Sequence, residues 1–365
     1  MKSPLLALAL PAVLVAAPRA PQAKVSAEAQ AARQALQGVL DSVHAAWFGK
    51  PYQALNALDV QGSMQIDVSA AAITAKANAL SQGQARVSAT RGGSARLGLK
   101  GTYFANGDFR TETSGDFSLL YYRVGNRGFL YSKDLNAYTT RVEPPPSDAP
   151  LSYFGWFRQC LNDIKAAYVD GPVFKASLGR EENRGGRVLQ TLVFEAPTGA
   201  YDARKREQSL AETLGFWKRG RLELVYDKAK RQPVQMDFRN EAQGVHTRMT
   251  FAYGAQDRLE RVEVDNRSRG MEGPASLQVS YGGDGLMSHL SGQLNGKDKK
   301  VAFDLKLGWG RDRRSSSIVS VPPPGATKRG REELETGLLV KLAGNMLELQ
   351  RAGLNLRSVP LGGKR

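Results

Sequence analysis

Polar and apolar residues alternate over residues 58–68, which predicts a strand with one buried and one wet face. The apolar parity holds Leu58, Val60, Met64, Ile66 and Val68. Similar short runs recur as far as residue 309. Turn-forming pairs separate several of them, such as NG at 106–107 and GN at 125–126. This pattern predicts a long meander of antiparallel strands.

Three stretches have helical rather than strand periodicity. Residues 29–46 place apolar side chains at three- and four-residue steps, and residues 150–170 form an apolar stripe through Phe154, Phe157, Leu161, Ile164 and Tyr168. Residues 331–351 are also amphipathic. Strands with interspersed helices predict the α+β class. We expect one domain, because the strands on both sides of 150–170 need that helix as a common cover.

The strand over 117–124 has large side chains on both parities. Phe117, Leu119 and Tyr121 share one, and Leu120 and Tyr122 share the other. Neither face of this strand is therefore expected to be simply wet. The helix over 150–170 is the most apolar one after the N-terminal segment. It is interpreted either as ordinary core or as a lid over the second apolar face.

The N-terminal segment has the pattern of a signal peptide. Lys2 precedes an apolar run at 5–17, which is too short to span a membrane, and small residues allow cleavage after Ala27. We therefore expect residues 1–27 to be removed and the mature protein to be soluble in the periplasm. A permanent N-terminal anchor is the alternative. The only cysteine, Cys160, rules out an internal disulfide and lies too far along the chain for a lipid-attachment signal.

The chain is strongly basic. It has 51 Lys and Arg against 35 Asp and Glu, a formal net charge of +16. This balance favours anionic partners such as lipid head groups or acidic polysaccharide, and transient contact with a membrane surface. Export argues against nucleic acid. The alternative is that these charges are only the solvated faces of a sheet.

Catalytic chemistry has no support in the sequence. The three histidines, His44, His246 and His289, lie on separate elements without metal-ligand spacing. No nucleophile elbow, P-loop or dinucleotide fingerprint is present. We therefore expect no catalytic residues, no metal site and no cofactor, and a protein that is not an enzyme.

Two stretches resemble the periplasmic LolA-type carriers of outer-membrane lipoproteins. The first is Phe109 and Arg110, an apolar strand, and then GNRGFLY at 125–131 and DLNAY at 134–138. It departs from the family at Thr111, where tryptophan is common, and at Phe129 and Leu130, which replace an apolar-tryptophan pair. The second is the stretch SIVSVPPPGA at 317–326, which is similar to the closing strand and terminus of that fold.

The resemblance implies a large curved antiparallel sheet, a half-barrel, with helices covering its concave face. It would occupy 28–326, with a lid helix at 150–170, followed at 327–365 by an added amphipathic helix and basic tail. The resemblance also implies a cavity that shields acyl chains, a lid, and an arginine that holds the lid closed, for which Arg110 is the candidate. The cavity candidates are Leu97, Leu99, Phe117, Leu119, Tyr121, Phe129 and Tyr131, and the lid candidates are Phe154, Trp156, Phe157 and Leu161.

The implied function is binding of acyl lipid or lipoprotein during transport to the outer membrane. Its partners would be an inner-membrane releasing complex and an outer-membrane acceptor. Two alternatives remain open. One is a periplasmic sensor or regulator that uses the same lipid-binding fold, and the other is a cell-envelope structural protein without a cavity.

Overall fold

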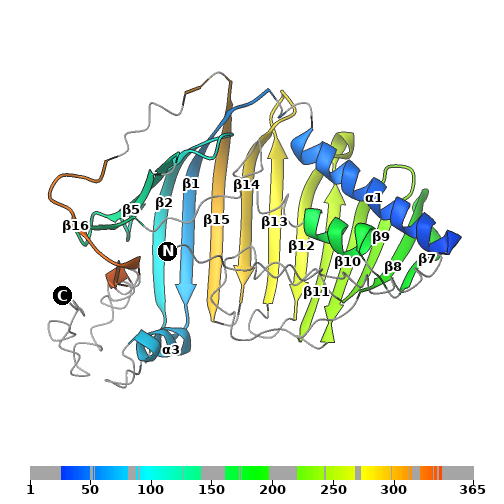
Figure 1. Cartoon of the computed structure of the whole chain (residues 1–365), viewed down its shortest axis with the longest axis horizontal. Coiled ribbons are helices and arrows are strands. Elements are labelled where there is room, and N and C mark those ends of the chain that lie inside the picture. The colour runs from blue at the N-terminus through cyan, green and yellow to red at the C-terminus, as the bar shows by residue number, and fades with distance from the viewer. Residues whose placement is uncertain are drawn as a thin grey trace, which may run out of the picture.

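The computed structural model shows one continuous sheet of 16 strands (Figure 1). It describes residues 26–338 except 50–51, 53, 81–87, 89–90, 126, 141–160, 172, 174, 197–219, 242–243, 268–272, 297, 312, 315–320, 332 and 335–336. The order across the sheet is β16-β6-β5-β4-β3-β2-β1-β15-β14-β13-β12-β11-β10-β9-β8-β7. The strands are β1 (Ala57–Val68), β2 (Gly93–Phe104), β3 (Phe109–Gly115), β4 (Leu119–Val124), β5 (Arg127–Ser132), β6 (Ala137–Thr139), β7 (Lys175–Arg184), β8 (Arg187–Glu195), β9 (Arg221–Asp227), β10 (Gln232–Asn240), β11 (Val245–Tyr253), β12 (Leu259–Asn266), β13 (Gly273–Tyr281), β14 (Met287–Asn295), β15 (Lys299–Gly310) and β16 (Thr327–Lys328).

The predicted fold class is confirmed. Neighbouring strands pair antiparallel except β16, which pairs parallel with β6. The two chain halves meet where β1 pairs with β15, so the sheet is not split into two. The strand expected at the start of 317–326 lies largely outside the described residues, which include only 321–326 of this segment. The short strand β16 follows it at the edge of the sheet.

The helices agree in part with the predictions. Helix α1 (Ala27–Phe48) matches the predicted 29–46 and begins at Ser26, whose Oγ accepts a hydrogen bond from the Ala29 amide at 3.1 Å. Residues 161–170 are helical, and the last six form the π-helix η2 (Lys165–Asp170). Helix α3 (Ala70–Leu80) was not predicted, although its alanine-rich sequence favours a helix.

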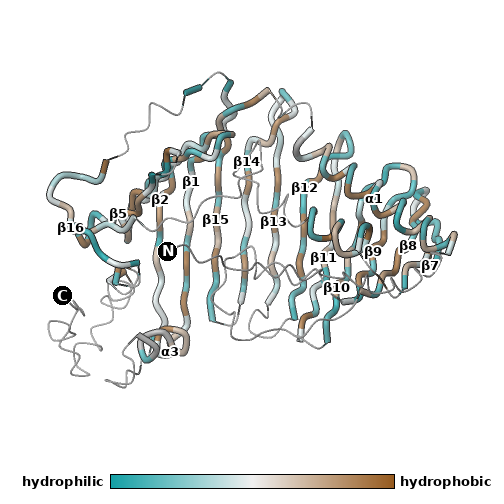
Figure 2. The backbone as a smooth tube through the Cα atoms, in the orientation of Figure 1, coloured by the Kyte–Doolittle hydropathy of each residue, from teal (hydrophilic) through white to brown (hydrophobic). Residues whose placement is uncertain are grey.

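Cross-strand register divides the sheet into an apolar and a polar face. Residues directly opposite on paired strands project to the same side. Gly62 of β1 lies opposite Leu99 of β2 and Leu305 of β15, whereas Gln61 lies opposite Lys100 and Lys306. We call the side of Leu99 and Leu305 the apolar face and the side of Lys100 and Lys306 the polar face. Figure 2 shows the alternation of apolar and polar positions along these strands.

In the described part of the chain, buried apolar residues form two clusters against the sheet. The main cluster packs α1 and η2 against the apolar face toward the β7 edge. It includes Leu36, Tyr168, Leu192, Phe194 and Phe238. The small cluster lies on the polar face near the β16 edge and joins Ala57, Phe104, Tyr122 and Phe129. In β4, Leu119 and Tyr121 lie on the apolar face and Leu120 and Tyr122 on the polar face, so both faces of this strand carry large side chains, as predicted.

Gly62 allows β1 and β15 to approach closely. A Cβ atom added there would overlap the Asp304 carbonyl oxygen and lie 2.9 Å from the Leu305 Cα atom. Because those atoms belong to the backbone, the strands themselves must move to accept a side chain. We expect Gly62→Ala to lower the free energy of unfolding by about 2 kcal/mol, measured by denaturant titration. Gly308→Ala is the control.

At Gly308 an added Cβ atom would make only an ordinary contact, 3.7 Å from the Asp59 Cβ atom. That substitution is expected to change stability by less than about 0.5 kcal/mol. Equal effects of the two alanines would show that the close approach at Gly62 is not a constraint.

Candidate functional site

The apolar face is wider than the helices that are described over it. Helix α1 contacts β7, β8, β10 and η2. In Figure 1 it crosses the β7 side of the sheet, whereas no described helix crosses the apolar face of β1, β15 or β14. We call the uncovered part the central apolar strip. Its members belong to neither buried cluster and are Met64, Ile66, Leu97, Leu99, Val264, Leu294, Val301, Phe303 and Leu305.

Members of the strip are half-buried, except that Leu294 is exposed at 41%. Cross-strand register makes the strip continuous. Met64 lies between Leu97 and Phe303, and Val301 lies between Ile66 and Leu294. A folded core normally buries such side chains almost completely, as it does Phe194 and Phe238 at 0% exposure. A contiguous half-exposed apolar surface of this kind is typical of a binding surface for apolar groups.

Helices α1 and η2 form one unit at the end of this surface. Arg33 of α1 donates a hydrogen bond from Nη1 to the Val169 carbonyl oxygen at 2.8 Å. The Tyr168 ring lies edge-on to Phe194, with centroids 5.9 Å apart. Burial raises the pKa of Tyr168, so the phenol stays neutral across the physiological range. This end of the apolar face is therefore closed by packed side chains, among them the neutral phenol of Tyr168.

The structure divides the seven predicted cavity residues between the two faces. Four lie on the apolar face, namely Leu97, Leu99, Leu119 and Tyr121. Phe117 precedes β4 and is half-buried. Phe129 and Tyr131 pair with Tyr122 and Leu120 on the polar face. Their expected place beside Leu97, Leu99, Leu119 and Tyr121 is corrected.

The predicted lid is described only in part. Phe154, Trp156 and Phe157 lie outside the described residues. Leu161 is 9% exposed and belongs to the main cluster with α1. The described part of this helix thus covers the β7 side of the apolar face, away from β2 and β4.

The expected contact between Arg110 and the lid is not found in the described part of the chain. Arg110 lies opposite Thr102 and Tyr122 on the polar face and pairs with Glu112. Residues 161–170 pack on the other face, so the sheet separates Arg110 from their carbonyl groups. Arg33 of α1 does donate to one of these carbonyls, that of Val169. Arg33 was not predicted, because the apolar stripe of residues 29–46 gives no information about the polar side chains between its members.

The β12 to β15 part of the strip was also not predicted. Its signal was present, since Val301, Phe303 and Leu305 alternate with polar residues. What the sequence did not show was that β15 pairs with β1. That pairing brings a strand from the end of the chain beside one from its beginning.

The buried carboxylate of Asp237 has a structural role on the polar face. Its side chain is 5% exposed and accepts hydrogen bonds from Arg239 Nε at 2.7 Å and Arg248 Nε at 3.0 Å. Burial alone would raise the pKa of Asp237, but these hydrogen bonds and the neighbouring positive charges lower it below its ordinary value. The group therefore stays ionised and paired at neutral pH, which does not suit a proton-transferring acid.

Within the described ranges, no group of three His, Cys, Asp or Glu side chains could hold a metal ion. None of the described helices is long and apolar enough to cross a membrane.

No protein-family model matches the chain, and no curated protein matches it. Solved structures similar to it include a putative outer membrane lipoprotein-sorting protein domain from Vibrio parahaemolyticus, with 11% identity and a TM-score of 0.26 over 78% of this chain and 96% of that one. A LolA superfamily protein from Nitrosomonas europaea has 8% identity and a TM-score of 0.29 over 78% and 97%. The Mycobacterium tuberculosis lipoprotein LppX has 7% identity and a TM-score of 0.22 over 78% and 98%. A LolA superfamily protein is thus among the solved structures to which the chain is similar.

Proposed function

We propose that the protein binds the acyl chains of a lipid or lipoprotein on the central apolar strip. The observation that carries the proposal is the continuous half-exposed apolar surface across β12 to β15, β1 and β2. It lies beside, rather than inside, the main cluster that packs α1 and η2. Surface that is not used to hold the fold together is available to hold a ligand.

The free energy gained by burying an acyl chain on the strip is large enough for binding without a covalent bond. Burial of one methylene group contributes about 0.8 kcal/mol, so a chain of about sixteen carbons supplies over 10 kcal/mol before ordering costs. Neighbouring strands are about 4.8 Å apart, so the distance across the sheet from β12 to β2, which includes β13, is roughly 24 Å. That length suits an extended acyl chain.

The biological role that we propose is transport. The protein would be exported by a signal at 1–27, of which residues 1–25 lie outside the described residues. It would receive an acylated client from an inner-membrane releasing complex and deliver it to an outer-membrane acceptor, touching membrane surfaces transiently. In this role the chain shields the acyl groups and carries out no reaction.

The test is the chain-length dependence of fatty acid binding, measured by displacement of a fluorescent acyl probe from the full chain. We expect the affinity to rise by about two- to fourfold for each added methylene, because each one buries further apolar surface on the strip. A diacid of the same length as each fatty acid is the matched control. Its second carboxylate must leave water, so it should bind far more weakly.

An absence of probe uptake would contradict acyl binding. So would an affinity that does not depend on chain length, since that result would indicate recognition of the carboxylate alone.

A further inference from the structure

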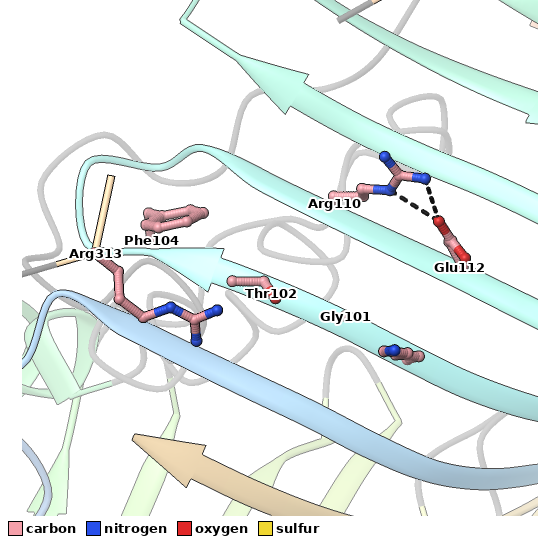
Figure 3. Close-up of a pocket in the computed structure, with 7 residues that line it drawn as sticks. Gly101, Thr102, Phe104, Arg110, Glu112 and Arg313 are labelled. Atoms are coloured by element: carbon pink, nitrogen blue, oxygen red, sulfur yellow. Dashed lines mark hydrogen bonds and ion pairs between the residues drawn. The ribbon is translucent and has the colours of Figure 1, made fainter. Parts of the chain in front are cut away.

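A pocket of about 270 Å³ lies on the polar face near the ends of β2 and β3, on the opposite side of the sheet from the central apolar strip. Its lining residues are Lys100, Gly101, Thr102, Phe104, Arg110, Glu112 and Arg313. Figure 3 shows Arg313 beside the end of β2 that carries Phe104, and Arg110 with Glu112 on the neighbouring strand. Three segments of the chain therefore each contribute a cation to one hollow.

Hydrogen bonds fix the segment that carries Arg313. The Asn56 side chain donates to the Arg313 carbonyl oxygen at 2.7 Å, and the Arg313 amide donates to Asn56 Oδ1 at 3.2 Å. Arg313 also pairs with Asp59, which accepts a hydrogen bond from Thr102 Oγ1 at 2.6 Å. The arginine is thus held over the pocket by Asn56, which precedes β1, and by Asp59 within β1.

The pocket has an excess of positive charge. Lys100, Arg110 and Arg313 face two carboxylates, Glu112 and Asp59, and Lys100 has no ion-pair partner among the described residues. Arg110 uses Nε and Nη2 on a single oxygen of Glu112, which leaves Nη1 free of that pair. The arginine side chains are 39% and 43% exposed, so their remaining donors are accessible.

From this arrangement we infer a binding site for a phosphate-class anion. The planar guanidinium group of an arginine can donate hydrogen bonds to two oxygens of a phosphate group at once. A lysine adds a positive charge without fixed geometry. The existing pairs are half-exposed ones that contribute little stability, so an anion can compete for their donors. The buried ring of Phe104 forms an apolar wall beside the anion. The anion would be either a free phosphate compound or the phosphate of a lipid head group.

Removing the charge of Arg110 and removing the charge of Glu112 are expected to have opposite effects on the affinity for phosphate. Binding of inorganic phosphate to the full chain, measured by calorimetric titration at low salt, should be saturable. Arg110→Gln and Lys100→Gln should each weaken it by about five- to tenfold, because each removes a cation from the anion. Glu112→Gln should tighten it by a similar factor, because it removes a competing carboxylate and frees Arg110.

The chain provides a matched control in Arg261 and Glu263. They form the same kind of pair, two residues apart on one strand of the polar face, with side chains 53% and 57% exposed, but they do not line the pocket. Glu263→Gln makes the same change in net charge, so it should leave phosphate binding within about twofold of the unchanged protein. Equal effects of Glu112→Gln and Glu263→Gln, or an absence of saturable binding, would overturn the inference. Because the readout is phosphate rather than an acyl chain, its failure is distinct from failure of the proposed function.

Vesicle flotation distinguishes the two sources of the anion. Vesicles of phosphatidylcholine are compared with vesicles that also contain phosphatidylglycerol. If the head group is the natural source, Arg110→Gln should reduce the added binding to phosphatidylglycerol, and Arg261→Gln, which makes the same change in net charge outside the pocket, should not. If phosphate binds in solution and neither variant changes flotation, the site serves a free phosphate compound.

Discussion

We expect Leu305→Asp to lower the affinity for a fluorescent acyl probe by at least about 100-fold. Leu305 is half-buried in the central apolar strip, between Gly62 and Leu290 in the cross-strand register. A carboxylate there must either lose its water when an acyl chain covers it or keep the chain away. Either outcome costs several kcal/mol, which exceeds the contribution of a few buried methylene groups.

The control is Lys306→Asp, one residue further along β15. Lys306 is exposed on the polar face, opposite Gln61. This variant makes a larger change in net charge than Leu305→Asp but does not touch the strip, so acyl binding should be unchanged. Thermal unfolding of both variants checks that each is folded. Binding that survives Leu305→Asp in a folded protein, or that is lost equally in both variants, would contradict the placement of the ligand.

Two phenylalanines on the same face of the sheet are expected to contribute very differently to the free energy of unfolding. Phe194 is 0% exposed in the main cluster, where it contacts Tyr168. Phe194→Ala removes a buried ring and leaves a cavity, so the free energy of unfolding should fall by about 3–5 kcal/mol. Phe303 is half-buried in the central apolar strip. Phe303→Ala should cost only about 1 kcal/mol, because water already reaches part of its ring.

Acyl binding should show the reverse contrast in protein that is folded under the assay conditions. Phe303→Ala removes ligand contact area and should weaken probe binding by about tenfold, whereas folded Phe194→Ala should bind nearly normally. Denaturant titration measures stability and probe titration measures affinity on the same samples. If Phe303→Ala proved as destabilising as Phe194→Ala and bound the probe normally, the strip would be ordinary core.

Local patterns in the sequence were enough to predict most of the strands. Alternation over 58–68 and 301–309 matches β1 and β15 closely. The pairing of β1 with β15 was not predictable in this way, because no local pattern specifies which distant strands become neighbours. The extent of the strip depends on that pairing, so its β12 to β15 members were missed.

The residues that share a face of the sheet were easier to predict within one strand than across a turn between two strands. The residues Leu119 and Tyr121 were grouped correctly, but Phe129 and Tyr131 were assigned to the wrong face. The register of the β4 to β5 hairpin pairs Val124 with Arg127, which brings Tyr122 opposite Phe129. Their ring centroids are 4.2 Å apart in the small cluster. A two-residue turn at 125–126, applied strictly, would have given this pairing from the sequence.

Arg110 shows a second limit of prediction from a single sequence. Its role was taken from its place in a family motif, but the face on which it projects is set by pairing with β2 and β4. The contact that joins two helices in the structure comes from Arg33 instead, which belongs to no such motif. Polar contacts between distant segments depend on the assembled tertiary structure, so they are the part of a site that a single sequence predicts least well.

The most direct test of acyl binding is native mass spectrometry of the protein purified gently from the cell envelope, followed by organic extraction and analysis of the extract. The account predicts a mass above that of the chain alone, an acyl lipid in the extract, and loss of this adduct in Leu305→Asp but not in Lys306→Asp. A mass equal to the chain alone, in protein that also takes up no acyl probe, would contradict it.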